Sequence, residues 1–265
     1  MKIVYLGDVV AKCGREAVIK AIPRIKEDFS YDALIVNVDN AAHGFGCTPK
    51  IVEQLFAAGV SAVVTGDHVW DQKELQPFLD SNKRIVRPLN YSDNLAGVGA
   101  TVVPLDTGQK ILVIEVVGRV FMPQVDSPIE KLENLLSGYK LKQNIDAIFV
   151  DVHAEATAEK QAIARWADGK VSAVIGSHTH VPTADAVILP KGSAYQTDVG
   201  MCGDYNGVIG FDEVAPIDRL KNQNSSRRLE PKSGPAEVCG VVIVINDKTG
   251  LAEKITPFRY NNQNM

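Results

Sequence analysis

Residues 171–180 read Val171-Ser172-Ala173-Val174-Ile175-Gly176-Ser177-His178-Thr179-His180. The apolar first half, residues 171–175, is typical of a strand that is buried on both faces. His178 and His180 stand two residues apart, which directs both rings to the same side of an extended chain. Because chemistry in α/β proteins gathers at the carboxyl ends of parallel strands, this stretch predicts a strand that ends at a functional site.

Four other segments have the same design, in which an apolar run leads to side chains that can bind a cation. The runs are residues 2–6, 33–37, 62–65 and 147–151, and the side chains that end or follow them are Asp8, Asp39, Asn40, Asp67, His68 and His153. Taken singly, each has a simpler role: aspartate is a favoured helix cap, and an Asp-Asn pair favours a turn. Their joint occurrence in one α/β pattern favours a metal site. His43, which lies three residues after Asn40, is expected at most at the rim.

Imidazole nitrogen and carboxylate oxygen are ligands for divalent transition metals, and a two-metal site needs a carboxylate that can bridge. The segments above supply eight donor-bearing side chains, more than the three or four that one zinc ion uses. We therefore predict two metal ions. The residue types suit iron, manganese and zinc alike and leave the metal open.

Amphipathic segments separate several of the apolar runs. Apolar residues at helical spacing predict a helix over residues 15–29, with a kink or break at Pro23. Thr48 followed by Pro49 predicts the start of a second helix that ends near Gly59. Further helices are expected over residues 128–136 and 157–166.

Turn signals divide the rest of the chain into hairpins. Strands are expected over residues 100–104 and 110–117, and over residues 236–246 and 251–260. Crossover units mixed with hairpins favour a mixed sheet, or two packed sheets, with outer helices. No linker divides the sequence, so we expect one domain over residues 1–265. The polar segment 221–234 is expected to form a surface loop.

The composition limits the classes of partner and compartment. A formal net charge of −4 argues against a broad surface for nucleic acid or anionic membrane. The four cysteines are far apart and contain no C-x-x-C pair, which is typical of reduced thiols in the cytosol. No stretch has the length of a membrane span or a signal peptide, so a cytoplasmic protein without a membrane partner is expected.

The sequence resembles a known family. Gly7-Asp8, Asp39-Asn40, Gly66-Asp67-His68, His153 and residues 176–180 match the ordered blocks of calcineurin-like metallophosphoesterases. The fuller resemblance is to the YmdB-like subfamily, through stretches such as Asn40-Ala41-Ala42-His43-Gly44 and Val86-Arg87-Pro88-Leu89-Asn90. The matching blocks run from residue 3 to about residue 211.

This resemblance implies a four-layer αββα sandwich of two mixed β-sheets flanked by helices, with a dinuclear centre. It implies iron, with manganese or zinc as alternatives, and a phosphodiesterase that acts on 2′,3′-cyclic nucleotides. By motif, Asp8 and His180 would hold one metal with Asn40 in contact, Asp39 would bridge, and Asp67, His153 and His178 would hold the second. A hydroxide bridging the metals would attack phosphorus, and His68 would act as the general acid.

Two positions depart from the subfamily, which usually has Glu where this chain has Asp39 and Asn where it has Asp67. The extra charge of Asp67 should hold cations more tightly and weaken the attraction for an anionic phosphate. The residues leave two alternatives open, a phosphomonoesterase and a low-turnover regulatory protein that binds a nucleotide or an RNA end. A homo-oligomer is also left open.

Overall fold

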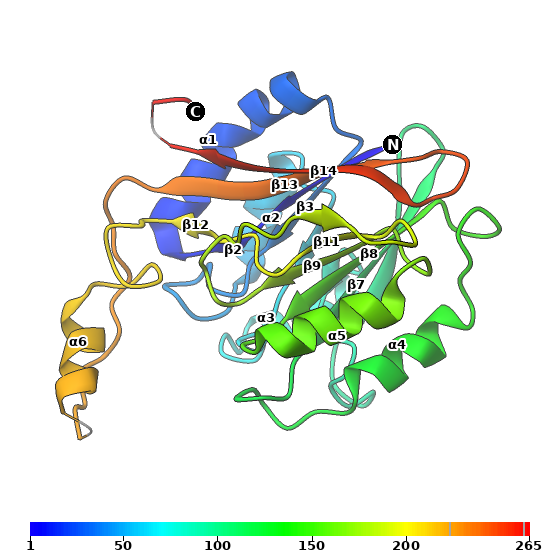
Figure 1. Ribbon diagram of the computed structural model, residues 1–265. Helices are drawn as coiled ribbons and strands as arrows, with labels where there is room; N and C mark the ends of the chain where they lie inside the picture. The colour runs from blue at the N-terminus through cyan, green and yellow to red at the C-terminus, as the bar shows by residue number, and fades with distance from the viewer. Residues whose placement is uncertain (223, 262) are drawn as a thin grey trace.

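The computed structural model describes residues 1–222, 224–261 and 263–265, and within them two mixed β-sheets pack face to face (Figure 1). In spatial order, the first sheet contains β2 (Asp8–Val9), β12 (Met201–Gly203), β13 (Glu237–Ile245), β1 (Lys2–Leu6), β3 (Ala33–Asn37), β4 (Ala62–Val64) and β5 (Ile85–Val86), with β14 (Ala252–Tyr260) paired to β13. The second sheet contains β10 (Val187–Ile188), β11 (Ala194–Gln196), β9 (Ala173–Ser177), β8 (Ala147–His153), β7 (Lys110–Val117) and β6 (Ala100–Pro104).

Parallel strands form the centre of each sheet. In the first sheet β1, β3, β4 and β5 are parallel, and β13 runs antiparallel to β1. In the second sheet β7, β8, β9 and β11 are parallel, while β6 and β10 close the two edges as antiparallel strands. The hairpins expected from the turn signals are present as β6–β7 and β13–β14.

Alternating side chains along the strands explain why the sheets are covered on both faces. In β1, Ile3 and Tyr5 pack in the core between the sheets, and Tyr5 lies with its ring centroid 5.0 Å from that of Phe149 in β8. The intervening residues Val4 and Leu6 pack outward, in the cluster that contains the buried face of the nearest helices. Because successive side chains of a strand point to opposite faces, one apolar run serves two cores.

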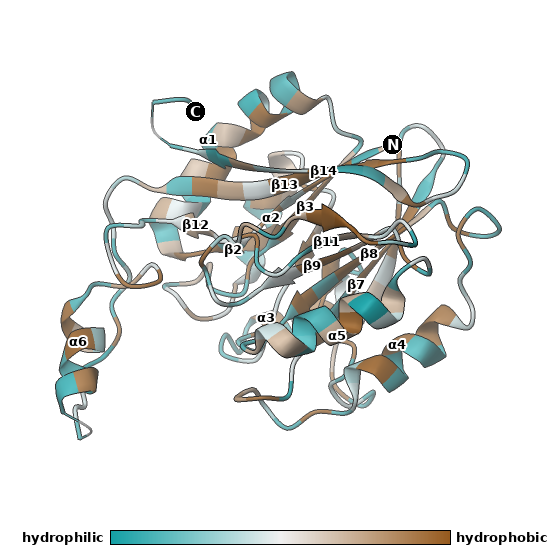
Figure 2. Ribbon diagram, in the orientation of Figure 1, coloured by the Kyte–Doolittle hydropathy of each residue, from teal (hydrophilic) through white to brown (hydrophobic). Residues whose placement is uncertain are grey.

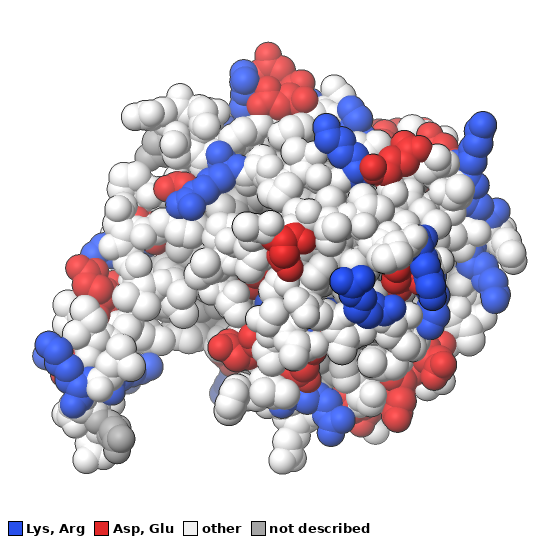
Figure 3. Space-filling model, in the orientation of Figure 1, with Lys and Arg blue, Asp and Glu red and all other residues white. Residues whose placement is uncertain are grey.

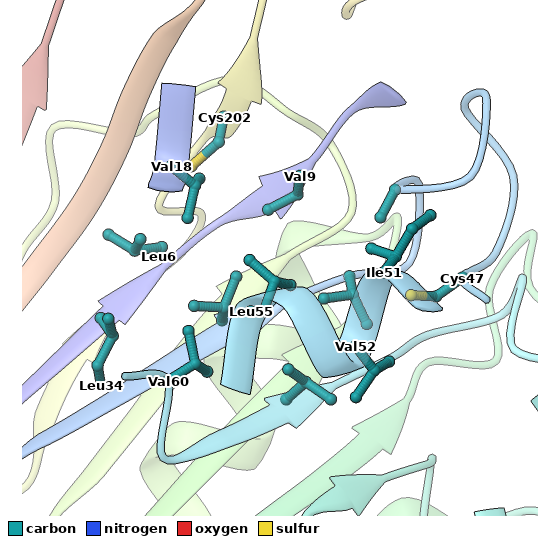
Figure 4. Packing of buried hydrophobic residues seen from close by; sticks show 14 of the residues in the cluster. Leu6, Val9, Val18, Leu34, Cys47, Ile51, Val52, Leu55, Val60 and Cys202 are labelled. Carbon is teal, nitrogen blue, oxygen red and sulfur yellow. The ribbon is translucent and has the colours of Figure 1, made fainter. Parts of the chain in front are cut away.

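The helices cover the outer face of each sheet. On the first sheet, α1 (Ala11–Phe29) and α2 (Pro49–Ala57) bury residues such as Val18 and Leu55 against Leu6 and Leu34 (Figure 4). On the second sheet, α4 (Pro128–Leu136) and α5 (Thr157–Ala167) bury a separate apolar cluster. Figure 2 shows hydrophobic strands between helices of mixed character. The predicted four-layer αββα architecture is therefore confirmed.

Helix α1 differs from its prediction at two points. It begins at Ala11 rather than residue 15, and it continues through Pro23 without a break. Pro23 is exposed, so the carbonyl group that loses its helical partner lies on the solvent side, while Val18, Ile22 and Ile25 keep the opposite face packed. Tertiary packing on the sheet therefore outweighs the local effect of proline.

Two further helices lie outside the layers proper. Helix α3 (Leu75–Ser81) follows β4, and α6 (Val214–Lys221) lies on an arm that projects from the body (Figure 1). Figure 3 shows a hollow between this arm and the body, with basic and acidic side chains interspersed over the visible face. Part of the predicted polar loop 221–234 returns from α6, and Gln223 of that loop lies outside the described residues. No helix in the described ranges is long and apolar enough to span a membrane.

Candidate metal centre and its surroundings

The ligand segments meet where the parallel strands of the two sheets end. Asp8 is the first residue of β2, and Asp39 and Asn40 lie in the turn after β3. The remaining side chains come from the turn after β4, from the last residue of β8 and from the turn after β9; they are Asp67, His68, His153, His178 and His180. The strands β8 and β9 are longer at this end than predicted, so that His153 and Ser177 are strand residues.

Four donor atoms converge around His153. Its Nε2 lies 3.0 Å from Asp67 Oδ1, 3.4 Å from Asp39 Oδ2 and 3.1 Å from His178 Nδ1. The fourth distance, from His178 Nδ1 to Asp67 Oδ1, is 3.4 Å. Two imidazole lone pairs and two carboxylates that face one another at such distances form a cage of the kind that divalent metals occupy.

A second pair of donors faces inward beside this cage. His180 Nε2 lies 3.1 Å from Asn40 Oδ1, and the Asn40 amide nitrogen donates to the carbonyl of Gly44, which turns its oxygen toward the histidine. Asp8 is fully buried; its Oδ2 accepts a bond from the amide of His178, whereas its Oδ1 has no hydrogen-bond partner among the described residues. A buried, unpaired carboxylate oxygen is costly unless a cation or donor meets it, so this atom fits a metal ligand.

Each of the three imidazoles is oriented through its other nitrogen. His153 Nδ1 lies 3.0 Å from Ser177 Oγ, which in turn donates to Asp151 Oδ1 at 2.8 Å. His180 Nδ1 lies 2.7 Å from the carbonyl of Ile209, and His178 Nε2 lies 3.3 Å from a carboxylate oxygen of Glu155. A proton held on these outer nitrogens leaves the inner nitrogens free to bind a metal.

The His-x-His turn has a strained backbone. His178 and His180 have φ values of 90° and 66°, in a region that residues with a Cβ atom rarely adopt. The carboxylate of Asp198 accepts bonds from the Thr179 amide at 3.0 Å and from its hydroxyl at 2.8 Å. The buried Lys160 connects that carboxylate, at 2.9 Å, to the carbonyl of Ser177, at 2.6 Å. Strain of this kind persists where the surroundings over-determine the conformation, as they do here.

Gly66 allows the two sheets to approach closely at the centre. A Cβ atom at this position would lie 2.5 Å from Asp39 Cγ and 2.6 Å from His153 Nε2. Any larger residue would therefore push the donors apart.

The buried charges shift one another strongly. Burial raises the pKa of Asp67, but hydrogen bonds from His153 and His178 reverse this effect and hold the pKa well below its ordinary value. Burial lowers the pKa of His153, yet the charge of Asp39 and the bonds to the nearby carboxylates raise it well above its ordinary value. The carboxylates around His153 thus favour positive charge at the position that a cation would take.

Two further carboxyl groups lie beneath the donors. Burial raises the pKa of Asp151 to about 7, and burial together with the charge of Asp151 raises the pKa of Glu115 well above its ordinary value. A cation above them would offset part of this concentration of negative charge.

His68 lies next to the cage, but its ring pairs with Asp71, outside the donor set. Its Nδ1 is 2.8 Å from Asp71 Oδ2, and its ring packs edge-on against Phe45, with centroids 5.1 Å apart. Burial lowers the pKa of His68, but the charges of Asp39 and Asp67 and the bond to Asp71 raise it overall. A half-buried histidine with a raised pKa can hold a proton near neutral pH.

Several neighbouring residues lie around the donor set without belonging to it. His43 is exposed and lies 3.2 Å from Glu230, outside the donor set. Asp185 accepts bonds from the Thr183 hydroxyl and the Thr197 amide. Ser177, Lys160 and Asp198 were not recognised from sequence. A charged residue among apolar neighbours, such as Lys160 on the buried face of α5, is the signal that could have revealed this support.

Comparisons with known proteins identify the family. The family model described as YmdB-like protein matches residues 4–258. The chain is 42% identical, over all of its length and 99% of the relative, to a 2′,3′-cyclic-nucleotide 2′-phosphodiesterase of Bacillus subtilis. It is 37% identical to a putative phosphatase/phosphodiesterase of Mycoplasma pneumoniae, over 94% of this chain and 89% of that protein.

Solved structures show the same fold. A hypothetical protein from Thermus thermophilus superposes with a TM-score of 0.91 at 38% identity, covering 98% of this chain and 99% of that one. The calcineurin-like phosphoesterase YfkN of Bacillus subtilis matches with a TM-score of 0.55 at 14% identity, over 98% of this chain and 90% of that one, which shows a shared fold alone. The predicted family and the predicted enzyme class, a phosphoester hydrolase, are confirmed: the chain belongs to the YmdB-like protein family.

Proposed function

We propose that this protein is a metal-dependent phosphodiesterase that hydrolyses 2′,3′-cyclic nucleotides. The observation that carries the proposal is the convergence of Asp39, Asp67, His153 and His178 beside a histidine that can hold a proton. The Bacillus subtilis relative, aligned over the whole chain, bears the name of that activity. A cyclic phosphate at the end of an RNA carries the same reacting group, so we include RNA ends among the substrates.

The donor set fits two metal ions. Asp8, Asn40 and His180 would hold one ion and Asp67, His153 and His178 the other, with Asp39 shared between them. Iron is the metal we expect, and manganese or zinc are the alternatives, since the same nitrogen and oxygen ligands suit all three. When bound, such ions supply positive charge for the phosphate oxygens and water of lowered pKa.

His68 has the properties of the proton donor. The charges of Asp39 and Asp67 and the bond to Asp71 raise its pKa despite burial, and Asp71 holds Nδ1 at 2.8 Å, which leaves Nε2 as the atom that can deliver a proton. We infer that this proton passes to the ribose oxygen that leaves phosphorus. General acid catalysis of this kind contributes about 10²–10⁴-fold to the rate.

The charge of Asp67 favours a diester over a monoester. A phosphodiester carries one negative charge, whereas a monoester carries nearly two at pH 7, so the carboxylate repels the monoester more strongly. The name of the Mycoplasma pneumoniae relative keeps a phosphomonoesterase as the second candidate. Initial rates on bis-p-nitrophenyl phosphate and p-nitrophenyl phosphate distinguish the two activities. A regulatory binding protein is favoured instead if nucleotides bind but no turnover follows with iron, manganese, cobalt or zinc.

The variant His68→Ala tests the mechanism. We expect turnover of a 2′,3′-cyclic nucleotide to fall about 10²–10⁴-fold while the metal content, measured by elemental analysis, stays unchanged. His43→Ala, which removes an exposed histidine outside the donor set, is the matched control and should keep full activity. Undiminished activity of His68→Ala would remove this residue from the reaction.

A further inference from the structure

The segment of residues 118–127, which connects β7 to α4, carries an exposed aromatic side chain on a left-handed backbone. Phe121 is 92% exposed and has a φ of 60°, the left-handed region. Phenylalanine is usually buried, and a residue with a Cβ atom rarely adopts this φ outside functional sites and tight turns. Figure 1 shows the segment passing below the N-terminal end of α5.

The first residues of this segment are held by the backbone of β8 and by a side chain of α5. The amide of Gly118 donates to the carbonyl of His153 at 2.9 Å. The next two amides, of Arg119 and Val120, donate to the carboxylate of Glu159 at 2.9 and 3.0 Å. Three residues of extended chain span at most about 10 Å, so the backbone of Phe121 lies within that distance of the Gly118 backbone bound to His153.

The ends of the segment are held together by one buried side chain. The side-chain oxygen of Asn90 accepts a bond from the backbone amide of Val117 at 2.9 Å. Its side-chain nitrogen donates to the Val117 carbonyl at 2.8 Å. It also donates to the carbonyl of Asp126 at 3.1 Å, while its backbone carbonyl accepts from the Asp126 amide at 3.0 Å. The two ends of the segment are therefore fixed, and the residues between them form a closed loop.

The residue after Phe121 packs against the body of the protein. Met122 packs against the apolar cluster that includes Tyr91, and the ring of Tyr91 meets that of Trp70 edge-on with centroids 5.6 Å apart. Trp70 follows His68 by two residues. Two adjacent residues of the loop thus differ in burial, since Met122 is partly buried against the body whereas Phe121 is exposed.

We propose that Phe121 is the platform on which the base of the nucleotide substrate stacks. This inference rests on the proposed function and deepens it, because it assigns recognition of the base to a residue outside the donor set. One ribose separates the base from the phosphate, and the loop leaves β7 where the Gly118 amide bonds to the backbone carbonyl of His153, at the sheet edge that carries the donors. Stacking on an aromatic ring is sequence-tolerant because every base has a π face.

Steady-state kinetics with two substrates test this role. Adenosine 2′,3′-cyclic phosphate carries a base, whereas 1-O-methylribose 2′,3′-cyclic phosphate has the same reacting group without one. We expect Phe121→Ala to raise the KM for the adenosine compound about ten-fold, equivalent to about 1.4 kcal/mol, with kcat within about two-fold of wild type. The base-free compound should be hydrolysed equally by wild type and variant.

Control variants separate stacking from other effects. Phe121→Trp should retain the KM of wild type for the adenosine compound, because a larger ring still stacks. Leu220→Ala, which removes another highly exposed apolar side chain on α6, should leave both substrates unaffected. An equal effect of Phe121→Ala on both substrates, no effect on either, or a change in the oligomeric mass measured by light scattering would overturn the proposal. If wild type hydrolyses neither compound, the proposed function itself fails.

Discussion

The two sheets supply different chemistry to the site and support it in different ways. The first sheet contributes the oxygen donors, which are Asp8 at the start of β2 and Asp39, Asn40 and Asp67 on short turns that follow its strands. The second sheet contributes the nitrogen donors, His153, His178 and His180. Each of these three histidines has a partner at its outer ring nitrogen, whereas Asp8 Oδ1 has no hydrogen-bond partner among the described residues.

This difference follows from the geometry of the ligands. A carboxylate presents two equivalent oxygens and about four lone pairs, so an approximate orientation is sufficient. A neutral imidazole presents one lone pair, and it does so only in the correct tautomer. Asp8 can therefore leave one oxygen unpaired among the described residues, whereas His153 requires the chain through Ser177 to Asp151. We expect variants that remove support from the nitrogen donors to have the larger effects.

The largest effect is expected from Lys160→Met, which removes the support of the His-x-His turn. Lys160 and Asp198 are both fully buried and lie 2.9 Å apart, so the variant leaves an unpaired buried carboxylate. Breaking such a pair destabilises a protein by about 3–5 kcal/mol. Urea unfolding should show this loss in the free energy of unfolding. Lys12→Met, at an exposed pair on α1, should change it by less than about 0.5 kcal/mol. A loss below about 1 kcal/mol at Lys160 would contradict the role that we assign to it.

Ser177→Ala tests the orientation of His153 without touching a ligand. The variant removes the acceptor that holds Nδ1 and should weaken metal binding about 10–100-fold, as loss of a partner behind a metal-bound histidine typically does. Titration calorimetry of metal-stripped protein with Mn²⁺ measures the affinity. Ser193→Ala removes a buried hydroxyl just before β11, away from the donors, and separates general destabilisation from this specific effect. Equal affinities for both variants would show that the chain through Ser177 does not matter.

Asp67→Asn tests how much the negative charge of an oxygen donor contributes to metal binding. The amide keeps an oxygen in place but removes one negative charge, so we expect metal binding to weaken about ten-fold. The KM for a phosphodiester should fall, because the carboxylate no longer repels the anionic substrate. Asp106→Asn, in an exposed turn, is the control for charge removal alone. Tighter metal binding by Asp67→Asn would contradict the electrostatic argument.

The layers of the fold could be predicted because local signals and packing agree. Runs such as residues 2–6 and 33–37 are apolar on both faces, which indicates central strands of a covered sheet. Helix α1 was predicted less well, since Val10 at its start provides no side-chain cap and Ala11 has a φ of 54°. These features depend on contacts with β12 and with the turn after β3, which lie far away in the sequence.

The convergence of the candidate donors could also be predicted, whereas the groups that support them could not. Asp39, Asp67 and His153 each follow or end a strand, and parallel strand ends meet at one edge. The partners behind the histidines come from elsewhere: Asp198 approaches from beyond β11, and the carbonyl of Ile209 from the base of the arm. Hydrogen bonds over such separations have no local pattern in the sequence.

The smallest effect is expected from Glu155→Gln. This variant tests whether a partner of a histidine contributes more to metal affinity when it is buried. Glu155 has a half-exposed side chain and lies 3.3 Å from His178 Nε2, in contrast to the fully buried Asp151 behind His153. Exposed pairs of this kind are worth about 0.2–1 kcal/mol, so metal affinity should fall by less than about five-fold. Because glutamine keeps an acceptor oxygen, the orientation of His178 should persist even though the charge is lost. The same calorimetric titration as for Ser177→Ala provides the measurement. A loss as large as that of Ser177→Ala would mean that each imidazole needs its partner equally, whatever the depth at which that partner lies.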